Sequence, residues 1–163
     1  MDRSAEFESL FRREHPRLVA LGLGLTGDRE VARELAQEAL LRAYIDWSKV
    51  RGYSAPAAWL RRVVINQAVD VHRRQVVERR TLQRVHSSDV VVDSSGDPAS
   101  SWWWRAVREL PERQRIAVAL FYVDEYSIAE IAEVMGVRQG TVKASLSHAR
   151  AALAAALARK EEL

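Results

Sequence analysis

Apolar side chains recur at helical spacing through nearly all of the 163 residues, and one polar stretch interrupts the pattern. This stretch, residues 87–101, is rich in Ser and Asp and contains one Gly and one Pro, which is typical of a linker. Three consecutive Val residues within it are compatible with a short strand, but no partner strand is evident nearby. The pattern therefore predicts an all-α protein in which two small helical domains, residues 1–86 and 102–163, are joined by a flexible linker.

Capping and turn residues predict where several helices begin and end. Gly27 suits the end of a first helix, and Asp28 can cap a second one. Residues 50–55 read as a loop, after which Pro56 suits the first turn of a third helix. Beyond the linker we expect helices over residues 102–110, from Pro111 onward, over 127–135 and over 140–159.

Charge is distributed in blocks rather than mixed evenly. Residues 51–84 carry a local charge of +6 and residues 138–160 a local charge of +5, whereas residues 28–46 and 87–100 carry −2 and −3. Two basic segments of this kind indicate polyanionic partners and are expected to face outward. The chain contains no Cys, which excludes disulfides, thiolate metal sites and Cys nucleophiles.

The segment YSIAEIAEVMGVRQGTVKASLSHAR, residues 126–150, has the pattern of a helix-turn-helix. Ser127 and Glu130 have the spacing of a capping box, and Gly136 suits the left-handed turn between two helices. Val142 and Leu146 give the second helix an inner face. Its outer face is predicted to contact phosphates and base edges in a major groove through Arg138, Gln139, Thr141, Lys143, Ser145, Ser147, His148 and Arg150.

Three motifs in a fixed order resemble the extracytoplasmic-function (ECF, group IV) sigma factors of the sigma-70 family. They are RELAQEALLRAY, AAWLRRVVINQAVDVHRR, and a long C-terminal segment that begins WRAVRELPERQ and includes the helix-turn-helix. The resemblance implies a sigma region 2 domain over residues 1–86 and a sigma region 4 domain over residues 102–163. It implies a factor that binds core RNA polymerase and directs promoter-specific initiation.

The resemblance also implies a division of roles between the two domains. In the family, an acidic helix docks on a coiled coil of the polymerase large subunit, and the matching positions are Glu34, Gln37, Glu38 and Arg42. The second domain recognises the minus-35 element through the helix-turn-helix and approaches the polymerase flap. The minus-10 element is recognised and opened by a loop and the following helix, for which the matching residues are Tyr53, Arg61, Arg62, Asn66, Asp70, Arg73 and Arg74.

Aromatic and basic residues outside the motifs allow further expectations. Tyr53 can offer a flat wall to a flipped base and Asn66 a bidentate amide, whereas Trp59 is expected in the core. Trp104 is expected to be buried, because it aligns with Val107 and Leu110 at helical spacing. Arg113 and Arg115 lie near a helix N-terminus and can add phosphate contacts.

Other functional classes have less support in the sequence. The four His residues lie in no zinc-binding spacing, and the chain has no Gly-rich phosphate loop, so we expect no enzyme, metal or cofactor. A helix-turn-helix regulator that acts without core polymerase is the main alternative. The expected partners are core RNA polymerase and promoter DNA, with an anti-sigma factor left open, and the expected location is the cytoplasm, with no membrane association.

Overall fold

The computed structural model describes residues 3–82 and 102–161, and every secondary-structure element in these ranges is a helix. The first domain comprises α1 (Arg3–Thr26), α2 (Arg29–Ile45), α3 (Trp47–Val50) and α4 (Pro56–Leu82). The second domain comprises α5 (Trp102–Glu109), α6 (Glu112–Tyr122), α7 (Ile128–Met135) and α8 (Gln139–Glu161). The predicted all-α, two-domain fold is confirmed, whereas the predicted linker lies outside the described residues.

Helix ends in the first domain follow the predicted local signals. Gly27 ends α1 in the left-handed region with φ +72°. One carboxylate oxygen of Asp28 then accepts hydrogen bonds from the amides of Glu30 (2.9 Å) and Val31 (3.1 Å) and so caps α2. Pro56 opens α4, as expected for a residue that lacks an amide proton and has a fixed φ.

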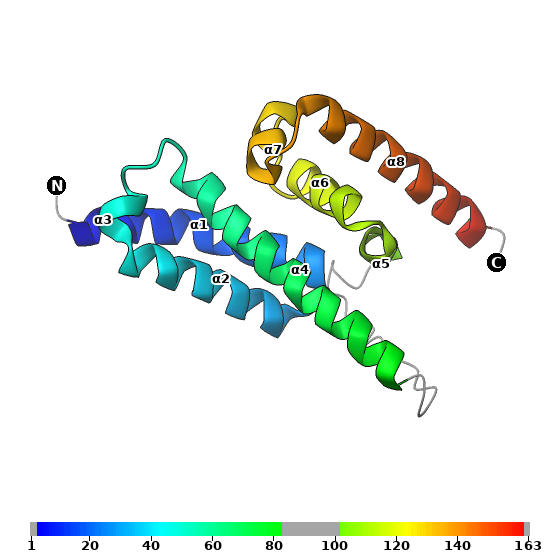
Figure 1. The fold of residues 1–163 in the computed structure, drawn as a ribbon, viewed down its shortest axis with the longest axis horizontal. Coiled ribbons are helices and arrows are strands. Elements are labelled where there is room, and N and C mark those ends of the chain that lie inside the picture. The colour runs from blue at the N-terminus through cyan, green and yellow to red at the C-terminus, as the bar shows by residue number, and fades with distance from the viewer. Residues whose placement is uncertain (1–2, 83–101, 162–163) are drawn as a thin grey trace.

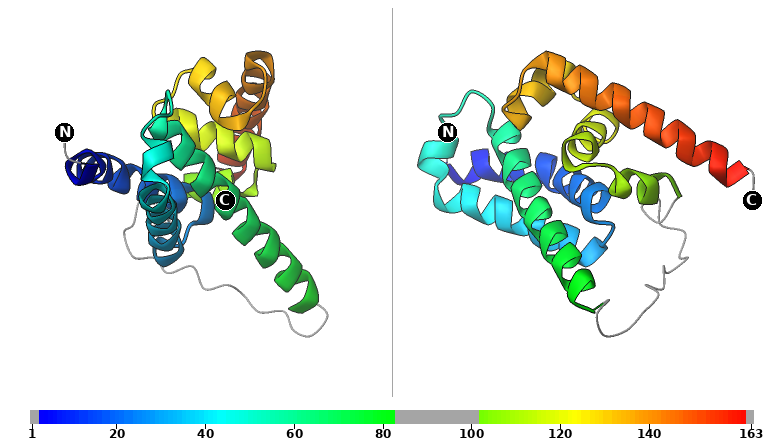
Figure 2. Two further views of the ribbon diagram at one scale, coloured as in Figure 1. Left: turned by 60° about the vertical axis from the view of Figure 1, so that its left-hand side comes forward. Right: turned by 45° about the vertical axis from the view of Figure 1, so that its right-hand side comes forward.

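The first domain is a bundle in which α1 and α2 pack side by side and α4 crosses them obliquely, with the short α3 at one end (Figure 1). A Cβ on Gly22 would lie 3.1 Å from the Cα of Ala32, so these two small residues allow α1 and α2 to approach closely. The distal half of α4 extends beyond the rest of the molecule (Figure 2). Its side chains are largely exposed, whereas the first half of α4 carries the buried residues Ala58, Leu60, Arg61, Val64, Ile65 and Ala68.

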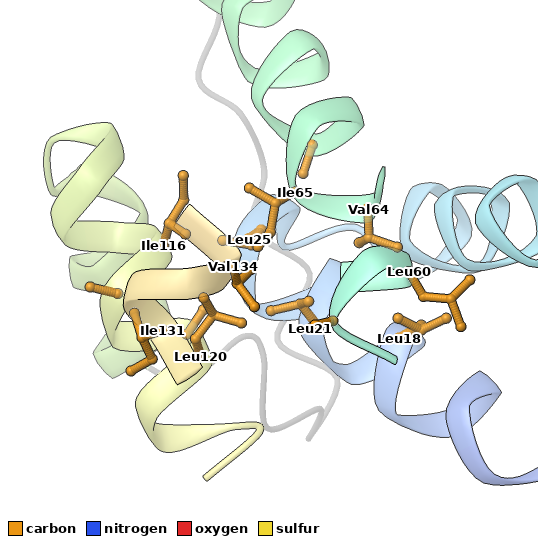
Figure 3. Close-up of a cluster of buried hydrophobic side chains, with 14 of the residues drawn as sticks. Leu18, Leu21, Leu25, Leu60, Val64, Ile65, Ile116, Leu120, Ile131 and Val134 are labelled. Atoms are coloured by element: carbon orange, nitrogen blue, oxygen red, sulfur yellow. The ribbon is translucent and has the colours of Figure 1, made fainter. Parts of the chain in front are cut away.

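The apolar core continues from one domain into the other (Figure 3). In this cluster Leu18 of α1 lies beside Leu60 of α4, whereas Leu21 and Leu25 of α1 lie toward Val134 of α7 and the α6 residues Ile116 and Leu120. Helices α1 and α4 thus pack against α5, α6 and α7, and we call this packing the closed arrangement. The two domains form one continuous hydrophobic core in the closed arrangement.

The predicted capping box at the start of α7 is present. Ser127 Oγ accepts a hydrogen bond from the Glu130 amide (3.2 Å), and a Glu130 carboxylate oxygen accepts one from the Ser127 amide (2.7 Å). Hydrogen bonding from Ser127, chiefly from its backbone amide, lowers the pKa of the Glu130 carboxyl below its ordinary range. Gly136 ends α7 with φ +64°, which gives the left-handed turn that the helix-turn-helix requires.

Replacing the cap residue should weaken the helix-turn-helix without altering its exposed face. We expect Ser127→Ala to reduce the free energy of unfolding by about 1 kcal/mol, because one amide of the first turn of α7 loses its acceptor. Urea denaturation followed by circular dichroism measures this change. Ser9→Ala is the control, since Ser9 is exposed within α1 and should tolerate Ala with no loss of stability.

Candidate nucleic-acid and polymerase interfaces

The second helix of the helix-turn-helix, α8, presents a polar and basic surface at its N-terminal end. Val142, Leu146 and Ala149 are buried against the rest of the second domain. Thr141 is half-buried on the boundary between the two faces. The other predicted contact residues, apart from Ser145, are exposed: Arg138, Gln139, Lys143, Ser147, His148 and Arg150.

The prediction that Ser145 lies on this outer face is wrong. Ser145 is buried, because it is three residues from Val142 and four from Ala149 and therefore shares their inner face. Its small side chain fits where α8 packs closely on the domain. The helical spacing alone could have identified this position.

Arg150 is oriented by aromatic residues of α6. Its Nε donates to the Tyr122 hydroxyl at 3.3 Å, and its guanidinium lies 5.4 Å from the centre of the Phe121 ring. The side chain is thus directed across the domain surface rather than free in solvent. Lys143 has no such partner and is exposed on α8.

The predicted minus-10 residues of α4, apart from Arg61, form one exposed stripe. Arg62, Asn66, Asp70 and Arg73 follow each other at intervals of three or four residues, so they share a helix face, and Arg74 lies beside them. All five side chains are exposed. Arg73 is not wholly free, since it forms an exposed ion pair of 3.3 Å with Glu112 of the second domain.

A pocket of about 260 Å³ lies where the loop before α4 meets the start of that helix. Tyr53 and Trp59 line it with ring centres 6.1 Å apart, together with Arg62. Trp59 is half-buried and lines this pocket, so the expectation of a core Trp59 is only partly met. Glu133 of α7 also lines the pocket, which places an acidic residue of the second domain beside the predicted base-binding residues.

The structure corrects the predicted placement of Arg61. Its side chain is 1% exposed, because it faces the domain junction rather than solvent. One terminal nitrogen donates to Glu14 of α1 at 2.8 Å, and the other donates to Asp124 at 3.0 Å, on the segment between α6 and α7. The guanidinium also lies 4.9 Å from the centre of the Tyr126 ring. We call Arg61, Glu14 and Asp124 the Arg61 ion cluster.

The two carboxylates of the Arg61 ion cluster differ in protonation behaviour. Burial alone would raise the pKa of Glu14, but hydrogen bonds from Arg61 and Arg13 hold it below the usual range. Burial raises the pKa of Asp124 and outweighs its hydrogen bond from Arg61. Asp124 Oδ2 and Arg61 Nε are buried without a hydrogen-bond partner, so desolvation is only partly compensated.

Arg115 is also buried, in contrast to the expectation that it contacts phosphate. It donates to the carbonyl oxygens of Arg108 (3.2 Å) and Leu110 (3.4 Å), which lie at the end of α5. Its terminal nitrogen is 3.4 Å from His72 Nε2 of α4. Arg113, two residues earlier, is exposed as expected.

The predicted polymerase-binding residues lie on the outer side of α2. Glu34, Gln37 and Arg42 are exposed, and Glu38 is half-buried and pairs with Arg42 at 2.8 Å. The sequence reasoning missed three large apolar neighbours, Leu41, Tyr44 and Ile45, which are 53%, 61% and 71% exposed. Residues three or four apart share one face of a helix, so these apolar side chains extend the face that carries Glu34 and Glu38. We call this mixed acidic and apolar surface the α2 stripe.

The described part of the chain contains neither a candidate metal cluster nor a candidate membrane span. No group of three His, Asp or Glu side chains within residues 3–82 and 102–161 is placed to hold a metal ion. None of the helices in these ranges combines the length and apolar character needed to span a bilayer. The acidic linker residues Asp89, Asp93 and Asp97 lie outside the described residues.

Comparison with known proteins identifies the class to which this fold and these surfaces belong. Residues 10–77 match the family model of sigma-70 region 2, and residues 100–153 match that of sigma-70 region 4. The chain therefore belongs to the sigma-70 family of RNA polymerase sigma factors, and its relatives are of the ECF type.

Two curated relatives and one solved structure show how far the likeness extends. The ECF RNA polymerase sigma factor SigM of Mycobacterium tuberculosis is 35% identical over 155 residues, covering 94% of this chain and 77% of that protein. The RNA polymerase sigma-E factor of Streptomyces antibioticus is 30% identical over 148 residues, covering 91% of this chain and 82% of that protein. Sigma factor RpoE of Bartonella quintana, solved in complex with the anti-sigma factor NepR, is 23% identical with a TM-score of 0.74 and covers 93% of this chain and 96% of that one.

His72 should report the contact between α4 and α6 through its titration. Burial, followed by the charges of Arg115 and Arg79, lowers the pKa of His72, while Glu112 opposes this effect. A lowered pKa in the folded protein means that His72 favours folding above its unfolded pKa, near 6.5, and that this contribution is lost as pH falls below it. We expect Arg115→Gln to raise the pKa of His72 in an NMR titration. Arg113→Gln, at an exposed position, should leave that pKa unchanged.

Proposed function

We propose that this protein binds core RNA polymerase and directs initiation at promoters that carry minus-10 and minus-35 elements. The observation that carries the proposal is the presence of both sigma-70 regions, in order, on two adjacent helical domains. A helix-turn-helix alone would fit many regulators. The likeness to SigM extends over 94% of the chain, so it includes the first domain as well as the DNA-binding one.

In this proposal α8 enters the major groove of the minus-35 element. The exposed residues at its N-terminal end, with Arg138, Lys143 and Arg150 among them, supply the positive charge that phosphates require. Gln139 and Thr141 lie within the first turn, where a recognition helix approaches base edges. The buried Ser145 belongs to the packing of the domain and has no part in this contact.

The first domain would recognise the minus-10 element as an opened strand. The pocket lined by Tyr53 and Trp59 offers aromatic faces to an unstacked base, and Arg62 at its rim can hold the adjacent phosphate. The exposed stripe of Asn66, Asp70, Arg73 and Arg74 continues this surface along α4. The duplex or strand would therefore run along the outer side of α4.

The α2 stripe would bind the coiled coil of the polymerase large subunit. Exposed apolar side chains next to acidic ones suit a protein partner, because burial of Leu41, Tyr44 and Ile45 releases water while Glu34 and Glu38 set the register. DNA is a poor partner for this acidic surface. The second domain would contact the flap of the polymerase.

We further propose that the protein has no catalytic activity of its own and acts in the cytoplasm. Polymerase supplies the chemistry of RNA synthesis, so the factor needs only surfaces that bind and orient. The sites described above are surfaces of this kind.

Run-off transcription with purified core RNA polymerase and a pool of randomised promoters tests the proposed function directly. We expect transcripts that depend on the protein, from promoters enriched in two short elements at a fixed spacing. Specific binding of duplex DNA by the free protein, together with no polymerase-dependent transcript, would instead support a regulator that acts alone.

Charge reversal on the α2 stripe should separate polymerase binding from folding. We expect Glu34→Arg combined with Gln37→Ala to reduce association with core polymerase at least tenfold, because positive charge replaces negative charge at the contact. Pull-down with core enzyme measures the loss, and circular dichroism checks the fold. Glu78→Arg, on the exposed part of α4, is the matched charge reversal and should assemble normally.

Removal of one cation from α8 should weaken DNA binding in a salt-dependent way. We expect Lys143→Ala to lower affinity for minus-35 duplex and to reduce the slope of log K against log salt by about 1, as loss of one phosphate contact requires. Fluorescence anisotropy at several salt concentrations gives the slope. Lys160→Ala removes the same charge at the far end of α8 and should leave the slope unaltered; equal slopes for all three proteins would refute the role of Lys143.

A further inference from the structure

The exposed stripe of α4 that we assign to the minus-10 element does not end at Arg73. Val77 and Arg80 follow at intervals of four and three residues, so they lie on the same face of the helix, and both side chains are exposed. Arg80 lies 18 residues after Arg62, which is five turns at about 3.6 residues per turn, so the two side chains leave the helix in the same direction. The face is therefore longer than the motif that predicted it, which ends at Arg74.

The distal half of α4 carries positive charge away from the body of the protein. Residues 73–82 contain four Arg and one Glu, a local charge of +3, and this part of the helix extends beyond the rest of the molecule (Figure 2). Arg73 has an exposed ion pair with Glu112, and a pair of this kind contributes little stability. Cations held in this way fit a polyanion that runs alongside the helix.

The spacing of the cations on this face suits the two edges of a DNA groove. Arg73 and Arg80 are seven residues apart, about 10 Å at about 1.5 Å per residue, and the major groove is about 12 Å wide. Their guanidinium groups can therefore reach phosphates on both edges. A protein partner would need several large apolar side chains, as on the α2 stripe, whereas Val77 is the one apolar residue on this face between Arg73 and Leu82.

The length of the stripe gives the distance between its two ends along DNA. The 18 residues from Arg62, at the rim of the pocket, to Arg80 correspond to about 27 Å of helix at about 1.5 Å per residue. A duplex that lies along α4 rises about 3.4 Å per base pair. Arg80 would therefore meet the duplex about 8 base pairs from the base that the pocket receives.

The order of the chain decides on which side of the minus-10 element these base pairs lie. The minus-35 element is about 25 base pairs upstream, or roughly 85 Å of duplex. Leu82, at the end of α4, and Trp102, at the start of α5, are 102 − 82, or 20, residues apart, a span of at most about 70 Å at about 3.5 Å per residue. A helix pointing downstream would leave about 110 Å to cover, beyond this reach even if the second domain adds about 25 Å. The distal half of α4 therefore points upstream, into the duplex between the two elements.

We propose that the distal half of α4 binds the duplex upstream of the minus-10 element, with Arg80 on a phosphate about 8 base pairs from the opened strand and Arg73 on a nearer one. The proposal rests on the proposed function for the identity of the minus-10 surface. The ligand is the sugar-phosphate backbone of double-stranded DNA, so the contact is independent of base sequence. It holds the duplex in line with α4 at the point where the pocket of Tyr53 and Trp59 receives an unstacked base.

Two fork templates test this contact in the complex of the full chain with core polymerase. Both carry, as a single strand, the minus-10 element that run-off transcription selects, and neither carries a minus-35 element. The upstream duplex extends about 12 base pairs in the long fork and about 4 in the short fork, so only the long fork reaches Arg80. We expect Arg80→Ala to lower affinity for the long fork at least threefold and its slope of log K against log salt by about 1, as measured by fluorescence anisotropy. Affinity for the short fork should stay the same.

Arg79→Ala is the matched control, because it removes the same charge from the adjacent residue. Arg79 lies seven residues, or about two turns, after His72 and thus on the side of α4 that faces Arg115 of the second domain. This variant should bind both forks like the original protein. In a series of long forks with one methylphosphonate each, placed about 6 to 10 base pairs upstream, one position should reproduce the loss and cause no further loss with Arg80→Ala.

The outcomes separate this inference from the proposed function. An unchanged affinity of Arg80→Ala for the long fork overturns the inference, while binding of both forks by the original complex leaves the proposed function standing. An equal loss on both forks, or weaker association with core polymerase in a pull-down, would mean that Arg80 acts on folding or on a protein partner, which also overturns it. If the original complex binds neither fork, the proposed function fails and this inference fails with it.

Discussion

The buried guanidinium of Arg61 must have carboxylates on both sides, and this requirement connects three helical segments of the chain. Glu14 of α1 satisfies one terminal nitrogen within the first domain, and Asp124 satisfies the other from the second domain. Since an isolated charge at 1% exposure would be very costly, Asp124 fixes where the α6–α7 segment sits on α4. The apolar cluster provides the attraction between the domains, and the ion cluster determines their register.

Local structure could be predicted from the sequence because each signal acts within a few residues. Gly27, Asp28, Ser127 and Gly136 end or begin helices through their own φ angles or side-chain hydrogen bonds, and all four do so in the structure. Arg61 could not be placed in the same way, since its partners are 47 and 63 residues away along the chain. A pattern of basic residues gives the total charge of a helix, but tertiary contacts determine which of its side chains reach solvent.

The α2 stripe also shows that tertiary packing decides which side chains of a helix reach solvent. Its acidic residues match a family motif, so they could be proposed from the sequence, whereas Leu41, Tyr44 and Ile45 read simply as helix-forming apolar residues. Only the packing of α2 against α1 and α4 shows that these three side chains are left on the outside. Exposed apolar residues of this size, next to acidic ones, are typical of a surface that a protein partner covers.

The closed arrangement leaves the α2 stripe uncovered but covers part of the predicted minus-10 surface. Docking through the α2 stripe needs no change in the junction, since that surface is on the far side of the first domain from α7 (Figure 1). Helix α7, in contrast, packs on α4, the helix that carries most of the predicted minus-10 residues, and its Glu133 lines the pocket of Tyr53 and Trp59. The charges at this junction are only partly compensated, because Arg61 Nε and Asp124 Oδ2 are buried without a hydrogen-bond partner. The apolar cluster therefore contributes more than the ion cluster to holding the two domains together.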